Sequence, residues 1–200
     1  MKNSKETRTK ILKAAKELFS ENGVENTSVR DIAKKSDCSH TTIYLYFKDK
    51  DELFNEIAYE PLQKLYEELN MINNSAADSS EKFKSICLSY VKFGLKQKQF
   101  YPLLSTFNGE KIDKDDFKHQ VNIVRVKILK IIKESIIEIL PNDIKDDETL
   151  SLTRGIFYFL HGTVMTYVTS HESLDKFMPR VEKTVNDFID FSILSKRGPY

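Results

Sequence analysis

The sequence contains few cysteines, glycines and prolines, and each shortage narrows the classes of protein it can encode. Two of its 200 residues are cysteines, Cys38 and Cys87, and neither has partners at metal-ligand spacing. This excludes a disulfide-rich scaffold and a zinc site, and it predicts a reducing, cytoplasmic setting. The six glycines and five prolines, together with long segments of helical periodicity and no alternating strand pattern, predict an all-α fold.

Long hydrophobic runs and an excess of one charge are also missing. No segment reaches the roughly 20 apolar residues that span a bilayer, and no secretory signal is present, so we expect a soluble protein without a membrane partner. The 31 basic and 30 acidic residues leave a formal net charge of +1, so nucleic-acid binding would have to come from a local surface. The Gly-x-Ser-x-Gly elbow, the phosphate-binding glycine loop and His-Glu-x-x-His do not occur. We therefore expect a protein that is not an enzyme and needs no metal or cofactor.

Hydrophobic periodicity and stop signals divide the chain into helices. We expect a first helix over residues 4–22 that ends at Gly23, and a long helix that starts near Asp49 and continues toward Met71. Pro61 lies inside this long helix and should kink or interrupt it, because proline removes one backbone hydrogen bond. Further helices are expected over residues 83–93, 100–107, 117–139, 146–170 and 174–195.

The segment 27–53 has the pattern of two short helices joined by a tight polar turn. We expect Thr27 to cap the first helix and Ser39 to cap the second. On the second helix Ile43 and Phe47 lie one turn apart and can face a core, whereas the opposite side carries hydroxyl groups, tyrosines and a leucine. Helices joined so tightly are typical of a helix-turn-helix, whose second helix enters the major groove of DNA.

The residues of this segment that point away from the core are the candidate DNA contacts. Leu45 is an unusual choice for a surface that meets only water, and it could contact a thymine methyl group. Taken singly, each candidate could equally be a solvated or half-buried surface residue; their occurrence together on a turn-separated helix pair favours DNA. The predicted DNA-binding residues are Thr27, Ser28, Ser39, His40, Thr41, Thr42, Tyr44, Leu45, Tyr46 and Lys50.

Lys50 has a separate predicted role at the start of the long helix. Asp49 followed by Glu52 resembles a capping box, which places Lys50 in the first helical turn, where the helix dipole disfavours a cation. A DNA phosphate would reverse that cost, because the free backbone N–H groups and the ammonium would hold one anion together. We therefore expect Lys50 to bind a phosphate.

Several motifs between residues 7 and 53 occur in a characteristic order: KILKAAKELF, a glycine at Gly23, TSVRDIA, TTIYLYF and K-D-E-L. In this combination the segment resembles the N-terminal domain of the TetR (tetracycline-repressor-like) family of bacterial regulators. The chain departs from many members at residues 36–38, where they have Ala-Gly-Val. His40 and Leu45 occupy positions that vary between members, so the resemblance does not specify the DNA sequence that is read.

The resemblance implies a three-helix helix-turn-helix DNA-binding domain, over residues 1–49, and a helical effector-binding and dimerisation domain over residues 50–200, with the last two helices at the dimer interface. The sequence adds its own sign of that interface, because Gly155 and Gly162 lie inside a helix, where each costs about 1 kcal/mol relative to alanine. A stripe of small residues lets a helix of a second copy approach closely; alternatively, both glycines pack inside the monomer. The predicted interface comprises Ser151, Gly155, Gly162, Thr166, Val181 and Phe188.

Aromatic residues at helical spacing, with His161 as a polar anchor, form the candidate effector pocket, since small-molecule sites are mostly apolar cavities with few polar groups. The simpler interpretation of most of them is hydrophobic core, and His161 could instead be hydrogen-bonded inside a helix interface. The predicted lining is Phe83, Tyr90, Phe93, Tyr101, Phe107, Phe157, His161 and Met165.

These features lead to the hypothesis of a homodimeric transcriptional repressor that binds a palindromic DNA operator and is released by a small, largely apolar effector. The main alternative is a DNA-binding architectural or division-linked protein of the same fold that senses no ligand. The two differ in whether any ligand lowers the affinity for the operator.

Overall fold

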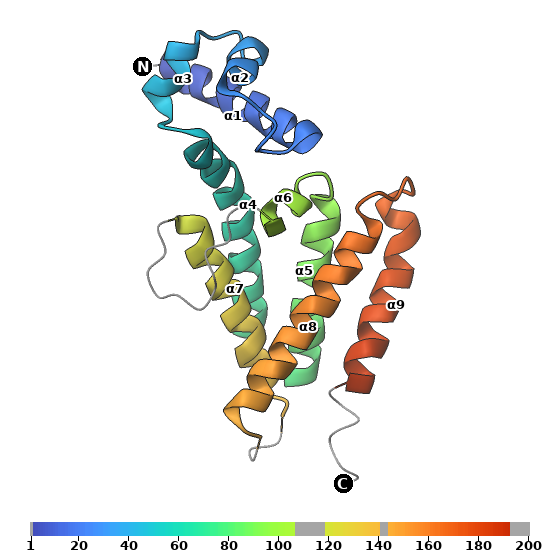
Figure 1. Cartoon of the computed structure of the whole chain (residues 1–200). Helices are drawn as coiled ribbons and strands as arrows, with labels where there is room; N and C mark the ends of the chain where they lie inside the picture. The colour runs from blue at the N-terminus through green and yellow to red at the C-terminus, as the bar shows by residue number, and fades with distance from the viewer. Residues whose placement is uncertain (1, 107–118, 141–143, 193–200) are drawn as a thin grey trace. The chain divides into compact units, whose positions relative to one another are not determined.

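The computed structural model describes residues 2–106, 119–140 and 144–192. The regular secondary structure in these ranges is helical (Figure 1), which confirms the predicted all-α fold. The helices are α1 (Lys2–Asn22), α2 (Val29–Lys35), α3 (His40–Tyr46), α4 (Lys50–Asn73), α5 (Ser79–Lys96), α6 (Tyr101–Thr106), α7 (Gln120–Ile137), α8 (Asp146–Tyr167) and α9 (Leu174–Ser192). Two compact units share them: the head, residues 1–62 with 99–123, and the body, residues 63–98 with 124–200.

The core of the head forms on one side of α1. Ile11, Ala15 and Phe19 are buried there, as the helical periodicity predicts. The ring of Phe19 packs on Phe54 of α4 with centroids 6.3 Å apart, and Phe54 packs on Phe100 at 5.5 Å. Two segments beyond residue 49 thus complete this core, so the head extends past the boundary that the sequence predicts.

α4 belongs to both units, because the division falls between Leu62 and Gln63. The helix is continuous over its 24 residues with Pro61 inside it, so the predicted interruption does not occur. Proline has no backbone N–H, and the carbonyl of residue 57 therefore lacks its helical donor one turn before the division.

The body is built around α5, which packs against α8 and α9 (Figure 1). Its hydrophobic core includes Phe83, Leu160, Val164, Val185 and Ile189. Lysines of α5 add ion pairs at the edges of this core, joining Lys82 to Glu138 of the segment after α7 at 2.7 Å, Lys84 to Asp190 at 2.6 Å and Lys92 to Glu182 at 2.9 Å.

Candidate nucleic-acid interface

Serine caps start both short helices of the head. The Ser28 hydroxyl accepts the backbone N–H of Asp31 at 3.1 Å, and the Asp31 carboxylate accepts the backbone N–H of Ser28 at 3.0 Å, which together form a capping box. Hydrogen bonds from Ser28 lower the pKa of Asp31. The Ser39 hydroxyl accepts the backbone N–H of Thr42 at 3.0 Å, which confirms the predicted cap of α3.

The turn between α2 and α3 contains a residue in the left-handed region. Asp37 has φ of 53°, a conformation that glycine adopts freely and that aspartate tolerates better than most residues. Ser36 is buried beside it and donates its hydroxyl to the carbonyl of Ile32 at 2.7 Å. The turn therefore keeps its sharp geometry although Asp37 stands where many members of the resembled family have glycine.

α3 has a buried side and an exposed side. Ile43 and Phe47, the residue that caps its C-terminus, are buried in the head, as predicted. His40, Thr41, Tyr44 and Leu45 are exposed, and the rings of His40 and Tyr44 meet edge to face at 4.9 Å. The exposed side thus offers hydroxyl, imidazole and apolar groups to a partner.

Two predicted contacts on α3 are partly engaged inside the head. The hydroxyl of Thr42 lies 2.7 Å from that of Ser39, so Thr42 supports the helix start. The Tyr46 hydroxyl donates to Ser4 Oγ at 3.1 Å and ties the end of α3 to α1. Both side chains are half-buried, so DNA would meet only part of each.

The prediction that Thr27 caps α2 and faces DNA is wrong for its side chain. Thr27 is 1% exposed, and its hydroxyl donates to the carbonyl of Gly23 at 2.8 Å, with the carbonyl of Leu18 at 3.3 Å. Leu18 lies in the last turns of α1, and Gly23 directly follows the helix. Thr27 therefore closes the end of α1, and the neighbouring Ser28 provides the cap.

Lys50 occupies the first turn of α4, but its surroundings differ from the prediction. Asp49 accepts the N–H of Glu52 at 2.8 Å as expected, whereas the Glu52 carboxylate accepts the N–H of Lys48 and not that of Asp49. The Lys50 ammonium donates to the carbonyls of Val24 at 2.9 Å and Glu25 at 3.3 Å. Lys50 thus links the start of α4 to the loop after α1.

Arg8 is a structural link that the sequence does not reveal. Its guanidinium lies 5.2 Å from the ring centroid of Phe47 and forms an ion pair with Glu56. The guanidinium therefore connects α1, the end of the recognition helix α3 and the second turn of α4. These partners are 39 and 48 positions away in the chain, so local periodicity carries no signal of the contact.

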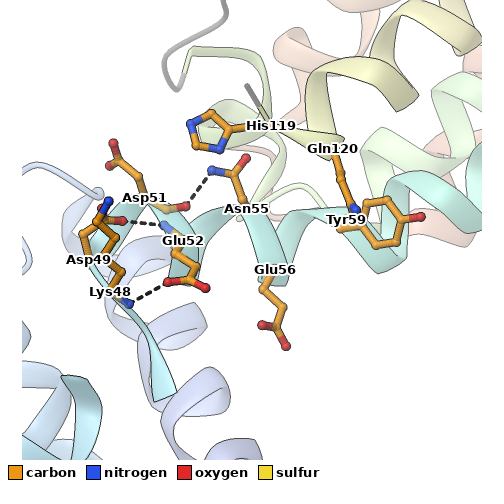
Figure 2. Close-up of a pocket in the computed structure, with 9 residues that line it drawn as sticks. All are labelled: Lys48, Asp49, Asp51, Glu52, Asn55, Glu56, Tyr59, His119 and Gln120. Atoms are coloured by element: carbon orange, nitrogen blue, oxygen red, sulfur yellow. Dashed lines mark hydrogen bonds between the residues drawn. The ribbon is translucent and has the colours of Figure 1, made fainter. Parts of the chain in front are cut away.

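A pocket of 560 Å³ opens in the head beside the start of α4 (Figure 2). Three of its four carboxylates have structural partners: Asp49 and Glu52 accept backbone N–H groups, and Glu56 pairs with Arg8. An acidic wall does not suit DNA phosphates, so this pocket is not part of the DNA surface. Its lining is Lys48, Asp49, Asp51, Glu52, Asn55, Glu56, Tyr59, His119 and Gln120.

Three of the predicted effector residues form an aromatic cluster in the body. Tyr90 meets Phe157 at 5.8 Å between ring centroids, and Phe157 stacks with His161 at 6.3 Å. Burial lowers the pKa of His161, which favours the neutral imidazole. Arg125, whose pKa is lowered by burial, lies near Tyr90 and was not among the predicted residues.

The other predicted effector residues lie in different surroundings. Phe83 is fully buried in the body core and Phe93 is half-buried on the same helix. Tyr101 is buried in the head. Met165 is exposed, so it does not line an enclosed space within the monomer. Phe107 lies outside the described residues.

The predicted dimer residues divide into an exposed set on α8 and a packed set on α9. Ser151, Gly155, Gly162 and Thr166 are exposed. Val181 is instead buried in the body, and Phe188 stacks on Phe159 with ring centroids 3.7 Å apart. Val181 therefore belongs to the core of the body and not to a surface between copies, whereas the half-buried Phe188 packs on α8 and its place at that surface stays a prediction.

The body exposes two large aromatic side chains, one on α8 and one on α9. Tyr158 is 66% exposed and Phe191 is 81% exposed. Tyr158 follows Gly155 by three positions and precedes Gly162 by four, so helical spacing places it on the glycine face. That spacing is visible in the sequence and could have added Tyr158 to the predicted interface.

No group of three or more His, Cys, Asp and Glu side chains in the described ranges could hold a metal ion. None of the helices in those ranges is long and apolar enough to cross a membrane.

Similarity to known proteins extends over most of the chain. The regulator AcrR of Shigella flexneri is 48% identical over 54 residues, which is 27% of this chain and only a quarter (25%) of the length of AcrR. The fatty acid metabolism regulator protein of Bacillus subtilis (strain 168) is 25% identical over 177 residues, 88% of this chain and 90% of that protein. The fold resembles the crystal structure of FadR from Bacillus subtilis in complex with stearoyl-CoA, with a TM-score of 0.65 and 20% identity over 88% of this chain and 96% of that one.

The capped pair α2 and α3, with a sharp turn between them and a buried side on α3, defines the head as a helix-turn-helix DNA-binding domain. Residues 11–57 match the family described as bacterial regulatory proteins, tetR family. The N-terminal part of the chain is thus similar to the DNA-binding domain of TetR-family transcriptional regulators.

Proposed function

We propose that the protein is a homodimeric repressor that binds a palindromic operator in the cytoplasm and releases it when a small, largely apolar effector occupies the body. The observation that carries the proposal is the exposed side of α3, where His40, Thr41, Tyr44 and Leu45 stand above a buried Ile43. A single α3 spans few base pairs, and a two-fold dimer would place two such helices about one DNA turn, ~34–36 Å, apart.

The glycines of α8 support dimerisation. A Cβ built at Gly155 or Gly162 meets no atom within 4 Å outside the adjacent helix backbone, so packing within the described monomer does not require either glycine. Each glycine still costs about 1 kcal/mol in a helix interior. The exposed Tyr158 of α8 and Phe191 of α9 would also be covered if the α8 and α9 faces of two copies met.

Replacing Gly162 with leucine tests the dimer. The variant should fold at least as stably as the wild type, because the site has room and leucine favours helix. We expect sedimentation velocity to show a monomer and DNA affinity to fall at least ~10-fold. The control is Ser85→Leu, an equally large change at an exposed site on α5. A Gly162→Leu protein that remains a dimer and binds DNA normally would contradict this interface.

The aromatic cluster of Tyr90, Phe157 and His161 supports an effector site in the body. The cluster combines aromatic rings with the imidazole nitrogens of His161, and small-molecule sites usually combine apolar groups with a few polar ones. The Bacillus subtilis FadR of similar fold was crystallised with stearoyl-CoA, so long-chain acyl compounds are a reasonable first set of ligands to test on this chain.

The effector is tested by native mass spectrometry of the purified protein and by fluorescence anisotropy of a selected DNA site titrated with candidate ligands. An effector that favours release must bind the free dimer more tightly than the DNA-bound dimer. We expect a bound ligand to weaken DNA binding and Phe157→Ala to weaken that response. If ligands that bind the protein leave its affinity for DNA unchanged, the result contradicts the effector proposal and favours the architectural alternative.

A further inference from the structure

The chemistry of the recognition helix limits how it can read bases. Residues 39–47, SHTTIYLYF, contain no Arg, Lys, Asn or Gln. These four residue types make the paired hydrogen bonds that distinguish guanine and adenine in the major groove. The exposed groups of α3 can make single hydrogen bonds through Thr41, His40 and the hydroxyl of Tyr44, and they can make apolar contacts. Discrimination between bases must therefore depend strongly on the apolar contacts.

Leu45 is the dominant apolar group on this surface. Its side chain is 78% exposed, although exposure of an apolar leucine side chain to water does not stabilise the fold. In the described part of residues 2–62, the exposed large hydrophobic residues are Leu45 and Tyr44, and both lie on α3. Thr41 precedes Leu45 by one helical turn, so the threonine methyl and the leucine lie on one line along the helix.

A thymine methyl group is the natural partner of such a line. It is the apolar feature of the major-groove edges, and it distinguishes T·A from the other base pairs. We infer that Leu45, with Thr41, is a specificity-determining residue that reads the C5-methyl group of at least one thymine in each half-site. The inference rests on the proposed placement of α3 in the major groove of a two-fold site.

Replacing thymine by deoxyuridine isolates this contact, because it removes the methyl group and leaves the hydrogen-bonding edges unchanged. A binding site is first selected from random duplex DNA with the full-length protein. Each thymine of the selected site is then replaced symmetrically in both half-sites, and affinities are measured by fluorescence anisotropy at fixed salt. Wild type, Leu45→Ala and the control Met71→Ala are compared; Met71 is 75% exposed on the body part of α4.

For the wild type we expect one thymine position at which the replacement weakens binding about fourfold per half-site, roughly 15-fold for both, as burial of one methyl group predicts. Leu45→Ala should reduce this effect to less than ~2-fold, while Met71→Ala should retain it. Circular dichroism should show unchanged helix content for Leu45→Ala, because the side chain is exposed.

Three results would overturn the inference, and they are distinguishable. If selection enriches no sequence, the proposed function fails and the inference fails with it. If a site is selected but no deoxyuridine replacement affects wild-type binding, DNA reading stands and methyl recognition is wrong. If Leu45→Ala keeps the full sensitivity, another residue reads the methyl group.

Discussion

Removing the hydroxyl of Thr27 should destabilise the head without changing its contacts with DNA. In Thr27→Val the carbonyl of Gly23 loses a hydrogen bond of 2.8 Å, and the carbonyl of Leu18 loses a weaker one of 3.3 Å. Thr27 is 1% exposed, and its two hydrogen bonds are partly buried. Losing such a bond costs about 0.5–1.5 kcal/mol net and up to about 3 kcal/mol where the acceptor stays unsatisfied, and the added methyl offsets part of this cost. We expect a loss of about 1–2 kcal/mol in the free energy of unfolding, or roughly 2–8 °C in Tm.

Urea denaturation followed by circular dichroism measures this loss. Thr9→Val is the matched control, because Thr9 makes a similar bond to the Lys5 carbonyl at 3.0 Å but is exposed; its effect should stay within about 0.5 kcal/mol. Where Thr27→Val is fully folded, its DNA affinity and salt dependence should equal those of the wild type. Unchanged stability would refute the role of the hydroxyl, and a reduced salt slope would show that Thr27 contacts DNA.

Two further predictions concern charged groups. The Lys50 ammonium directs two of its three N–H donors at the carbonyls of Val24 and Glu25, and we expect the third to bind a DNA phosphate. Lys50→Ala should therefore weaken binding to all DNA sequences and lower the slope of log affinity against log salt by about 0.9. An unchanged slope would show that Lys50 only links α4 to the loop after α1. Burial lowers the folded-state pKa of His161, so the unfolded chain binds a proton at this residue more readily than the folded chain does. The stability that depends on neutral His161 is therefore complete above the unfolded pKa of about 6.5 and is lost as pH falls through that value toward the folded pKa. Urea midpoints at about pH 7.5 and about pH 5.5 should therefore differ less in His161→Gln than in the wild type, and an equal difference would exclude His161 as the source.

The sequence was sufficient for features set by local patterns. The spacing of Ile43 and Phe47 correctly placed one side of α3 in the core, and Ser39 before a helical run correctly marked its cap. The cap of α2 was misplaced by one position, because Thr27 and Ser28 are both good capping residues. Only the buried bond of Thr27 to the end of α1 decides between them, and that contact depends on how the loop folds back.

The candidate sites were harder to predict where helices have apolar residues on more than one side. On α9 the sequence could not tell that Val181 faces the core while Phe191 stays exposed, because the choice depends on where α5 and α8 lie. Lys50 illustrates the same limit for a polar group. Its place in the first turn of α4 followed from the capping pattern, but the carbonyls it contacts belong to residues about 25 positions earlier.

The packing of Phe100 on Phe54 bears on how this regulator could exchange parts with its relatives during evolution. The head is a discontinuous domain: the chain leaves it after residue 62, returns at residue 99 and leaves again after residue 123. A single recombination point near residue 50 would keep Phe54 and Phe100 together but join them to a foreign α1, whose residues at positions 16 and 19 were selected for other partners. New DNA specificity is therefore more easily acquired by substitutions at exposed positions such as Leu45 than by exchange of the whole head.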